Sequence, residues 1–195
     1  MHLKTQKGKL YVLQPRINQS RERTKLKENL SAQVSAYKAR ERVYSAISAG
    51  AFFILIGIIY VINLPSNLWD AVVSFFGSFT LARVPTTGVY LPAPISPASH
   101  AVLYGAIFQL CIGLGILQII MLLLRITWQS PIGKTAETMG NLVYWFGSGY
   151  LVATYLNSTT TMSKWFVFWA GALVILGLSF VARSFVLLAK RKTSS

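Results

Sequence analysis

Six polar side chains lie within or at the ends of otherwise apolar segments of this 195-residue chain. A polar or charged group in an apolar environment must be hydrogen-bonded or paired with an opposite charge. A cluster of such groups can bind or conduct a polar solute or ion, or it can join helices. The six residues are Gln118, Arg125, Glu137, Asn141, Ser179 and Arg183.

Four apolar segments would have to position these side chains, namely residues 46–64, 101–124, 139–156 and 165–188. Each has 18 to 24 residues, and a helix needs about 20 to cross a hydrocarbon layer of about 30 Å. Only 12% of the chain is charged and its mean hydropathy is +0.50. We therefore predict an all-α fold, a four-span transmembrane helical bundle over residues 44–190.

The basic residues indicate how this bundle is oriented. Eleven of the 19 lysines and arginines precede the first segment, and only Arg83 and Lys164 lie in the loops predicted on the opposite side. Loops rich in lysine and arginine stay in the cytoplasm. We therefore expect an integral protein of the cell or plasma membrane with both termini cytoplasmic, the C-terminal one being a basic tail over residues 191–195.

The orientation also predicts where the six polar residues meet. The second and fourth segments run inward and the third runs outward, so all six fall in the cytoplasmic half of the membrane. Gln118 and Arg125 are seven residues apart, a spacing that returns a helix to nearly the same face. We expect the six to converge there, with Glu137 as the counter-charge of Arg183 or Arg125. We favour hydrogen bonding between helices as their role, with a binding or conduction site as the alternative.

Residues 1–43 form a basic cytoplasmic arm. Residues 1–19 are expected to be mobile, and from about Arg21 a helix is predicted, with Leu26, Leu30 and Val34 on one face. We expect this juxtamembrane helix to bind anionic lipid headgroups. A cytoplasmic partner protein or a second copy of the chain is the alternative, and nucleic acid is the least favoured partner. The predicted contact residues are Arg21, Arg23, Lys25, Lys27, Lys38, Arg40 and Arg42.

The outer loop, residues 65–96, has two parts. Residues 67–82 are predicted to form an amphipathic helix in the membrane interface, because the segment is too short to span. Residues 83–96 contain three prolines and are expected to be extended, with no regular ladder of hydrogen bonds. His100 follows at the outer end of the second span, where we expect it to be in contact with water.

The absence of known catalytic motifs excludes several enzyme classes. The single cysteine, Cys111, rules out an intrachain disulfide, and two distant histidines do not provide a metal site. The sequence has no G-x-x-x-x-G-K-[ST], H-E-x-x-H or G-x-S-x-G motif. We therefore predict no cofactor and no metal.

A non-enzymatic accessory or scaffolding membrane protein is the function that the sequence favours. The alternative is a subunit of a small-solute or ion transporter or channel, and such a subunit would need a homo-oligomer or a membrane-protein partner to complete a pathway. A membrane enzyme is the third possibility, with active residues supplied by a partner.

Overall fold

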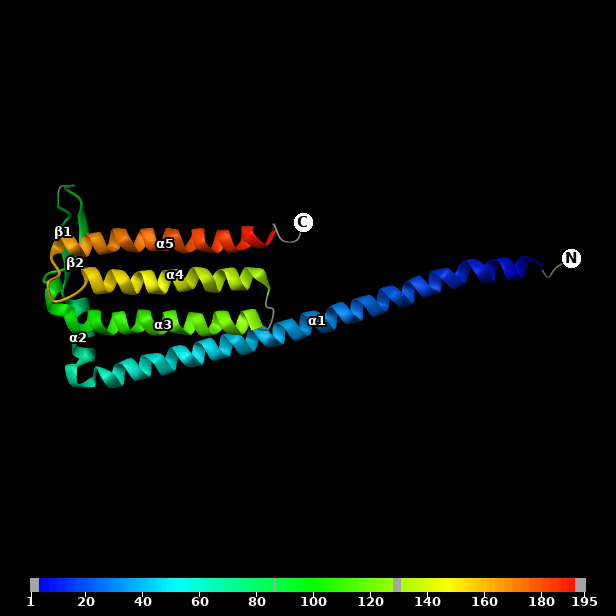
Figure 1. The fold of residues 1–195 in the computed structure, drawn as a ribbon, viewed down its shortest axis with the longest axis horizontal. Helices are drawn as coiled ribbons and strands as arrows, with labels where there is room; N and C mark the ends of the chain where they lie inside the picture. The colour runs from blue at the N-terminus through cyan, green and yellow to red at the C-terminus, as the bar shows by residue number, and fades with distance from the viewer. Residues whose placement is uncertain (1–3, 86, 128–130, 192–195) are drawn as a thin grey trace. The chain divides into compact units, whose positions relative to one another are not determined.

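The computed structural model describes the backbone of residues 4–85, 87–127 and 131–191. Side chains are described over residues 22–85, 87–127 and 131–189. The chain divides into two compact units, Met1–Ile47 and Ser48–Ser195. In order, its elements are α1 (Lys4–Ile62), η1 (Leu64–Ser66), α2 (Leu68–Gly77), β1 (Phe79–Arg83), β2 (Tyr90–Pro94), η2 (Pro97–His100), α3 (Ala101–Thr127), α4 (Ile132–Tyr155) and α5 (Met162–Arg191) (Figure 1).

The first unit consists of the N-terminal part of α1. The helix begins at Lys4, so the predicted start near Arg21 is wrong, whereas the mobility expected of residues 1–19 stays a prediction. Lysine, glutamine, leucine and arginine recur through this stretch, and all four have high helix propensity. Beyond the backbone of Arg191, the predicted tail 191–195 lies outside the described residues.

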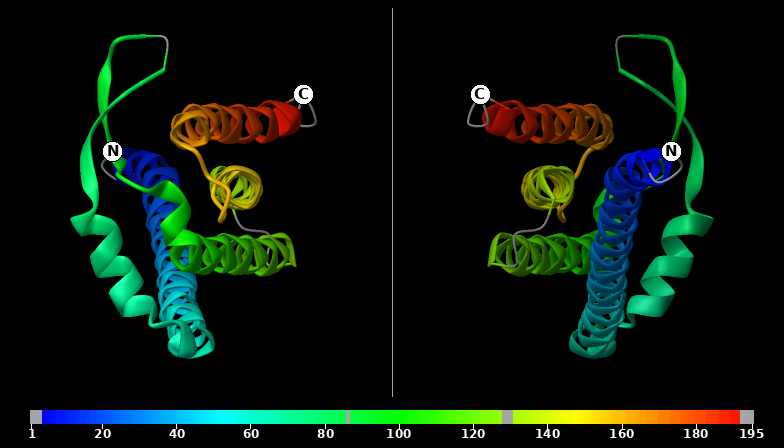
Figure 2. Two further views of the ribbon diagram at one scale, coloured as in Figure 1. Left: turned by 90° about the vertical axis from the view of Figure 1, so that its left-hand side faces the viewer. Right: turned by 90° about the vertical axis from the view of Figure 1, so that its right-hand side faces the viewer.

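In the second unit α3, α4 and α5 form a layer with α4 in the middle (Figures 1 and 2). Glycines bring the helices close together. A Cβ added at Gly147 would lie 2.7 Å from Cγ2 of Ile175 on α5, and one added at Gly115 would lie 2.9 Å from a ring carbon of Phe146. Small residues at such contacts let helix backbones approach closely.

The end of α1 also packs on this layer. The side-chain amide of Asn63, just after α1, donates to Oε1 of Gln109 on α3 at 2.9 Å. A Cβ added at Gly113 of α3 would meet the side chain of Leu55, at 2.5 Å from Cδ1. The C-terminal end of α1 therefore contacts α3 through Leu55 and Asn63.

The loop after α1 differs from the prediction. The helix α2 ends at Gly77, and β1 and β2 form an antiparallel two-stranded ribbon in which Phe79 pairs with Pro94 and Arg83 with Tyr90. The predicted absence of a ladder is therefore wrong, and the fold is mostly helical rather than strictly all-α.

The spacing of the prolines explains why the ribbon tolerates them. Val84 N donates to Val89 O at 2.8 Å, and Ile95 N donates to Ser78 O at 3.0 Å. Every other residue from Val89 to Ile95 therefore hydrogen-bonds to β1 or to a residue next to it. Pro92 and Pro94 occupy the intervening positions, whose N–H would point away from the partner strand.

Three helices in the described part of the chain are long and apolar enough to cross a membrane, namely Glu22–Ile62, Pro97–Thr127 and Met162–Ala189. They cover three of the four predicted spans, the first of them as far as Ile62. The fourth, residues 139–156, lies in α4 except for its last residue, and the mean hydropathy of α4 is lowered by polar residues such as Lys134, Glu137 and Asn141. The structure therefore supports membrane insertion and leaves the count of four spans as a prediction.

Candidate functional site

One end of the second unit carries most of its buried aromatic side chains. We call it the ribbon end: α2, the β1–β2 ribbon, the starts of α3 and α5 and the end of α4. Tyr104, Trp165 and Val152 form its centre. The ring of Phe75 on α2 lies edge-on to Trp165, with centroids 6.0 Å apart, and edge-on to His100, 5.2 Å apart. Aromatic contacts therefore fix α2 against the helix layer.

His100 is buried within this cluster and is only 4% exposed, so the expectation that it contacts water is wrong. Its Nε2 lies 3.0 Å from Oγ of Ser78, which follows α2. Ser78 Oγ donates its own proton to the backbone oxygen of Phe75 at 2.8 Å. The imidazole is therefore the donor in the Ser78–His100 bond, and the pair links the end of α2 to η2, directly before α3, rather than activating a serine nucleophile.

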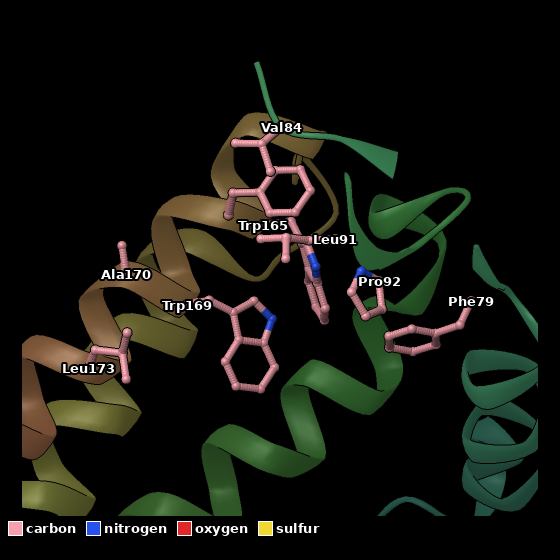
Figure 3. A pocket seen from close by; sticks show the side chains of 9 residues that line it. Phe79, Val84, Leu91, Pro92, Trp165, Trp169, Ala170 and Leu173 are labelled. Carbon is pink, nitrogen blue, oxygen red and sulfur yellow. The ribbon is translucent and has the colours of Figure 1, made fainter. Parts of the chain in front are cut away.

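A pocket of about 500 Å³ lies between the ribbon and α5 (Figure 3). Pockets of this volume hold small ligands, and their lining is mostly apolar with few polar groups. Here every lining side chain is apolar except for the indole N–H groups of two tryptophans. The lining residues are Phe79, Val84, Leu91, Pro92, Trp165, Phe166, Trp169, Ala170 and Leu173.

Two polar atoms of the ribbon end have no hydrogen-bond partner among the described residues, the hydroxyl of Tyr104 and Nε1 of Trp165. These residues are 1% and 2% exposed. A buried donor without an acceptor costs free energy, and buried polar groups of this kind are uncommon. Trp165 also lines the pocket, although its Nε1 is itself enclosed by neighbouring atoms.

Two members of the predicted polar cluster, Ser179 and Arg183 on α5, lie against Gly140 of α4. A Cβ added at Gly140 of α4 would lie 3.0 Å from the backbone oxygen of Ser179 and 3.5 Å from Cβ of Arg183. The backbones of α4 and α5 are therefore in contact at this point. The buried hydroxyl of Ser179 donates to Leu176 O at 2.7 Å, within its own helix.

The other predicted members have different surroundings. Glu137 forms its ion pair with Lys134, three residues earlier in α4, at 3.1 Å. Gln118 and Arg125 are half-buried, whereas Asn141 and Arg183 are exposed. Within the described residues, no hydrogen bond or ion pair joins Gln118, Asn141, Ser179 or Arg183 to one another. A shared pocket for the six remains a prediction.

Helical geometry shows which side of α4 carries its polar residues. Gly140 and Gly147 face α5, and Gly149 faces α3, where an added Cβ would lie 3.3 Å from Cβ of Cys111. At 100° per residue, Asn141 and Ser148 lie between these two faces. Asn141 is exposed and Ser148 is half-buried, so α3 and α5 leave a polar face of α4 open.

The basic helix of the first unit presents its side chains to the outside. Leu26 and Leu30 are 60% and 62% exposed, and Val34 and Tyr37 are also exposed. The backbone of Arg21 is helical, and its side chain lies outside the described part of the chain. The other six predicted contact residues are all exposed: Arg23, Lys25, Lys27, Lys38, Arg40 and Arg42.

Over the described residues, no group of three or more histidines, cysteines, aspartates or glutamates could hold a metal ion. Comparison of the chain with protein-family models, curated proteins and solved structures gave no match.

The sequence reasoning missed the pocket because the ribbon was taken for irregular chain. A usable signal was present in the two-residue spacing of Pro92 and Pro94, which one edge of a two-stranded ribbon allows.

Proposed function

We propose that the chain is a four-span integral membrane protein with both termini in the cytoplasm, and that it acts as a non-enzymatic accessory or scaffolding protein. Its basic helix binds the anionic headgroups of the cytoplasmic leaflet. Three apolar helices support the membrane location. The fourth span is α4, which α3 and α5 flank on two sides.

The observation that carries this proposal is the exposed apolar face of the basic helix. Leu26, Leu30, Val34 and Tyr37 recur at helical spacing and are all exposed. Lysines and arginines surround this face. An amphipathic helix of this composition binds an anionic membrane surface through buried apolar area and charge attraction, each basic residue near the surface adding about 1 kcal/mol.

A fluorescence experiment tests this role of the helix. An environment-sensitive fluorophore is attached at Gln33→Cys in a Cys111→Ala background, because Gln33 lies on the same face as Leu30 and Tyr37. The full-length protein is placed in nanodiscs of phosphatidylcholine or of phosphatidylglycerol. We expect a blue shift only in phosphatidylglycerol, and its loss at high salt because exposed charges are screened.

A pair of variants tests whether the basic charges cause the shift in that experiment. Replacing Lys25, Lys27, Lys38 and Arg40 by glutamine should abolish the shift, and replacing Ser31 and Ser35 by alanine should leave it unchanged. An identical spectrum in the two lipids would rule out headgroup binding by the helix and would favour a protein partner.

A subunit of an ion or small-solute transporter or channel is the second candidate, favoured by the open polar face of α4. Under that proposal Asn141→Leu abolishes K⁺ or Cl⁻ flux from loaded proteoliposomes without loss of folded protein. The control is Tyr150→Leu, because Tyr150 lies nine residues away, on the opposite face of α4. Absence of flux with the unmodified protein would exclude a role for this chain alone in conducting these ions.

A further inference from the structure

The pocket between the ribbon and α5 points to a ligand with one long apolar chain. We propose that it binds an acyl chain of a membrane phospholipid, which enters from the bilayer along α5. This inference concerns the ribbon end alone, so its failure would leave the proposal for the basic helix unchanged.

The lining selects the chemical class of the ligand. Phenylalanine, valine, leucine, proline and alanine provide no side-chain hydrogen-bonding group, and the two tryptophans provide only N–H donors. A ligand that matches this lining is apolar along its length and carries a hydrogen-bond acceptor. An ester-linked acyl chain has both features, because its carbonyl oxygen accepts and its methylenes do not.

The buried indole of Trp165 is the second, independent observation. Its Nε1 has no hydrogen-bond partner among the described residues, and the residue is only 2% exposed. Figure 3 shows this ring beside Leu91 and Pro92 of the ribbon, with Trp169 next to it on α5. The nitrogen itself is enclosed, so the indole would have to turn toward the pocket before an ester carbonyl between the ribbon and α5 could satisfy this unpaired donor.

The pocket is continuous with a surface suited to lipid. Leu173, one of its lining residues, is 71% exposed. Further along α5 from the pocket, Val174, Phe180 and Val181 are exposed as well. An acyl chain can therefore pass from the exposed apolar side of α5 into the pocket without crossing a polar barrier.

Photocrosslinking in proteoliposomes tests this proposal. The full-length protein is reconstituted in phosphatidylcholine containing an ester-linked phosphatidylcholine with a diazirine on one acyl chain. Adducts are located by mass spectrometry after illumination. We expect labelling of Leu91, Trp165 and Trp169 to exceed that of Phe180 and Val181 several-fold. Equal labelling along α5 would show only the general contact of any span with lipid and would overturn the proposal.

Filling the pocket provides the matched test. Ala170→Phe adds a ring inside the pocket, whereas Val181→Phe adds the same ring to exposed α5 surface outside it. The first variant should lose the excess labelling and the second should retain it. Unchanged labelling in a folded Ala170→Phe protein would contradict the assignment.

Two further probes distinguish the source of the chain. An ether-linked phosphatidylcholine with the same diazirine lacks the carbonyl acceptor, and we expect its excess labelling to be reduced several-fold. A diazirine-bearing fatty acid at equal concentration should label the pocket less than the ester-linked phospholipid. Stronger labelling by the fatty acid would overturn the choice of a phospholipid.

Discussion

The two ends of the α3–α4–α5 layer are stabilised by different kinds of contact. At the ribbon end, side chains from α2, α3 and α5 meet in one aromatic cluster, and the Ser78–His100 bond joins the residue after α2 to η2. At the opposite end, polar groups are bonded within their own helix, as in the pairs Glu137–Lys134 and Ser179–Leu176. The close approach of α4 and α5 at that end depends on Gly140.

The difference shows which contacts hold this fold together. An aromatic side chain contributes large buried area to several elements at once. A polar side chain in a helix can be satisfied locally, by the backbone one turn away, and then contributes little between helices. We therefore expect substitutions at the ribbon end to cost more stability than substitutions of the predicted polar residues.

Trp165→Ala should give the largest effect. The indole is almost completely buried and contacts the rings of Phe75, Phe79 and Phe168. Removing a buried aromatic ring costs about 3–5 kcal/mol in a well-packed core. Arg183→Ala at the opposite end is the control and should cost less than about 1 kcal/mol, because exposed side chains away from special features contribute little. Unfolding in detergent micelles measures both, and equal losses would contradict the difference between the two ends.

Gly140→Ala should give an intermediate effect. The new Cβ would lie 3.0 Å from the backbone oxygen of Ser179, which cannot move away as a side chain can. Overpacking of this kind costs about 1–3 kcal/mol. Gly177→Ala is the matched control, because an added Cβ there meets nothing within 4 Å, and alanine favours a helix by up to about 1 kcal/mol. Stability that falls equally in both variants would show that the α4–α5 contact is looser than described.

Glu137→Gln should give the smallest effect. Its ion pair with Lys134 is partly exposed on both sides, and exposed pairs of this kind contribute about 0.2–1 kcal/mol. Lys134→Gln should cost a similar amount, and the double variant should cost less than the sum of the two. A much larger loss for Glu137→Gln alone would indicate a partner on another helix, as the sequence-based prediction requires.

The sequence predicted the apolar helices well because hydrophobicity over 18 or more residues is a strong signal. It located the segments that became the C-terminal half of α1, α3, α4 and α5. The ribbon was not predicted because its prolines indicated an irregular chain. The strand is possible because Pro92 and Pro94 pair with β1 in a suitable register, and that pairing is not visible in the local sequence. The predicted partner of Glu137 was an arginine on another helix, chosen because it lies at the same depth in the membrane. The observed partner, Lys134, lies one turn earlier in the same helix.

The burial of His100 was also beyond the sequence. Its neighbours are Phe75 and Ser78, more than 20 residues earlier, which reach it only because α2 folds back onto α3. Contacts of this kind follow from tertiary structure and leave no local periodicity to read.

The position of α4 is the central claim, because α4 must cross the membrane between α3 and α5 for both termini to lie in the cytoplasm. Single cysteines at Gly133 and at Ser158, in a Cys111→Ala background, place one label at each end of α4. A membrane-impermeant maleimide is applied to intact cells and to permeabilised cells. Labelling of Ser158→Cys in intact cells, with labelling of Gly133→Cys only after permeabilisation, is the predicted result. Labelling of both positions from the same side would contradict the four-span account.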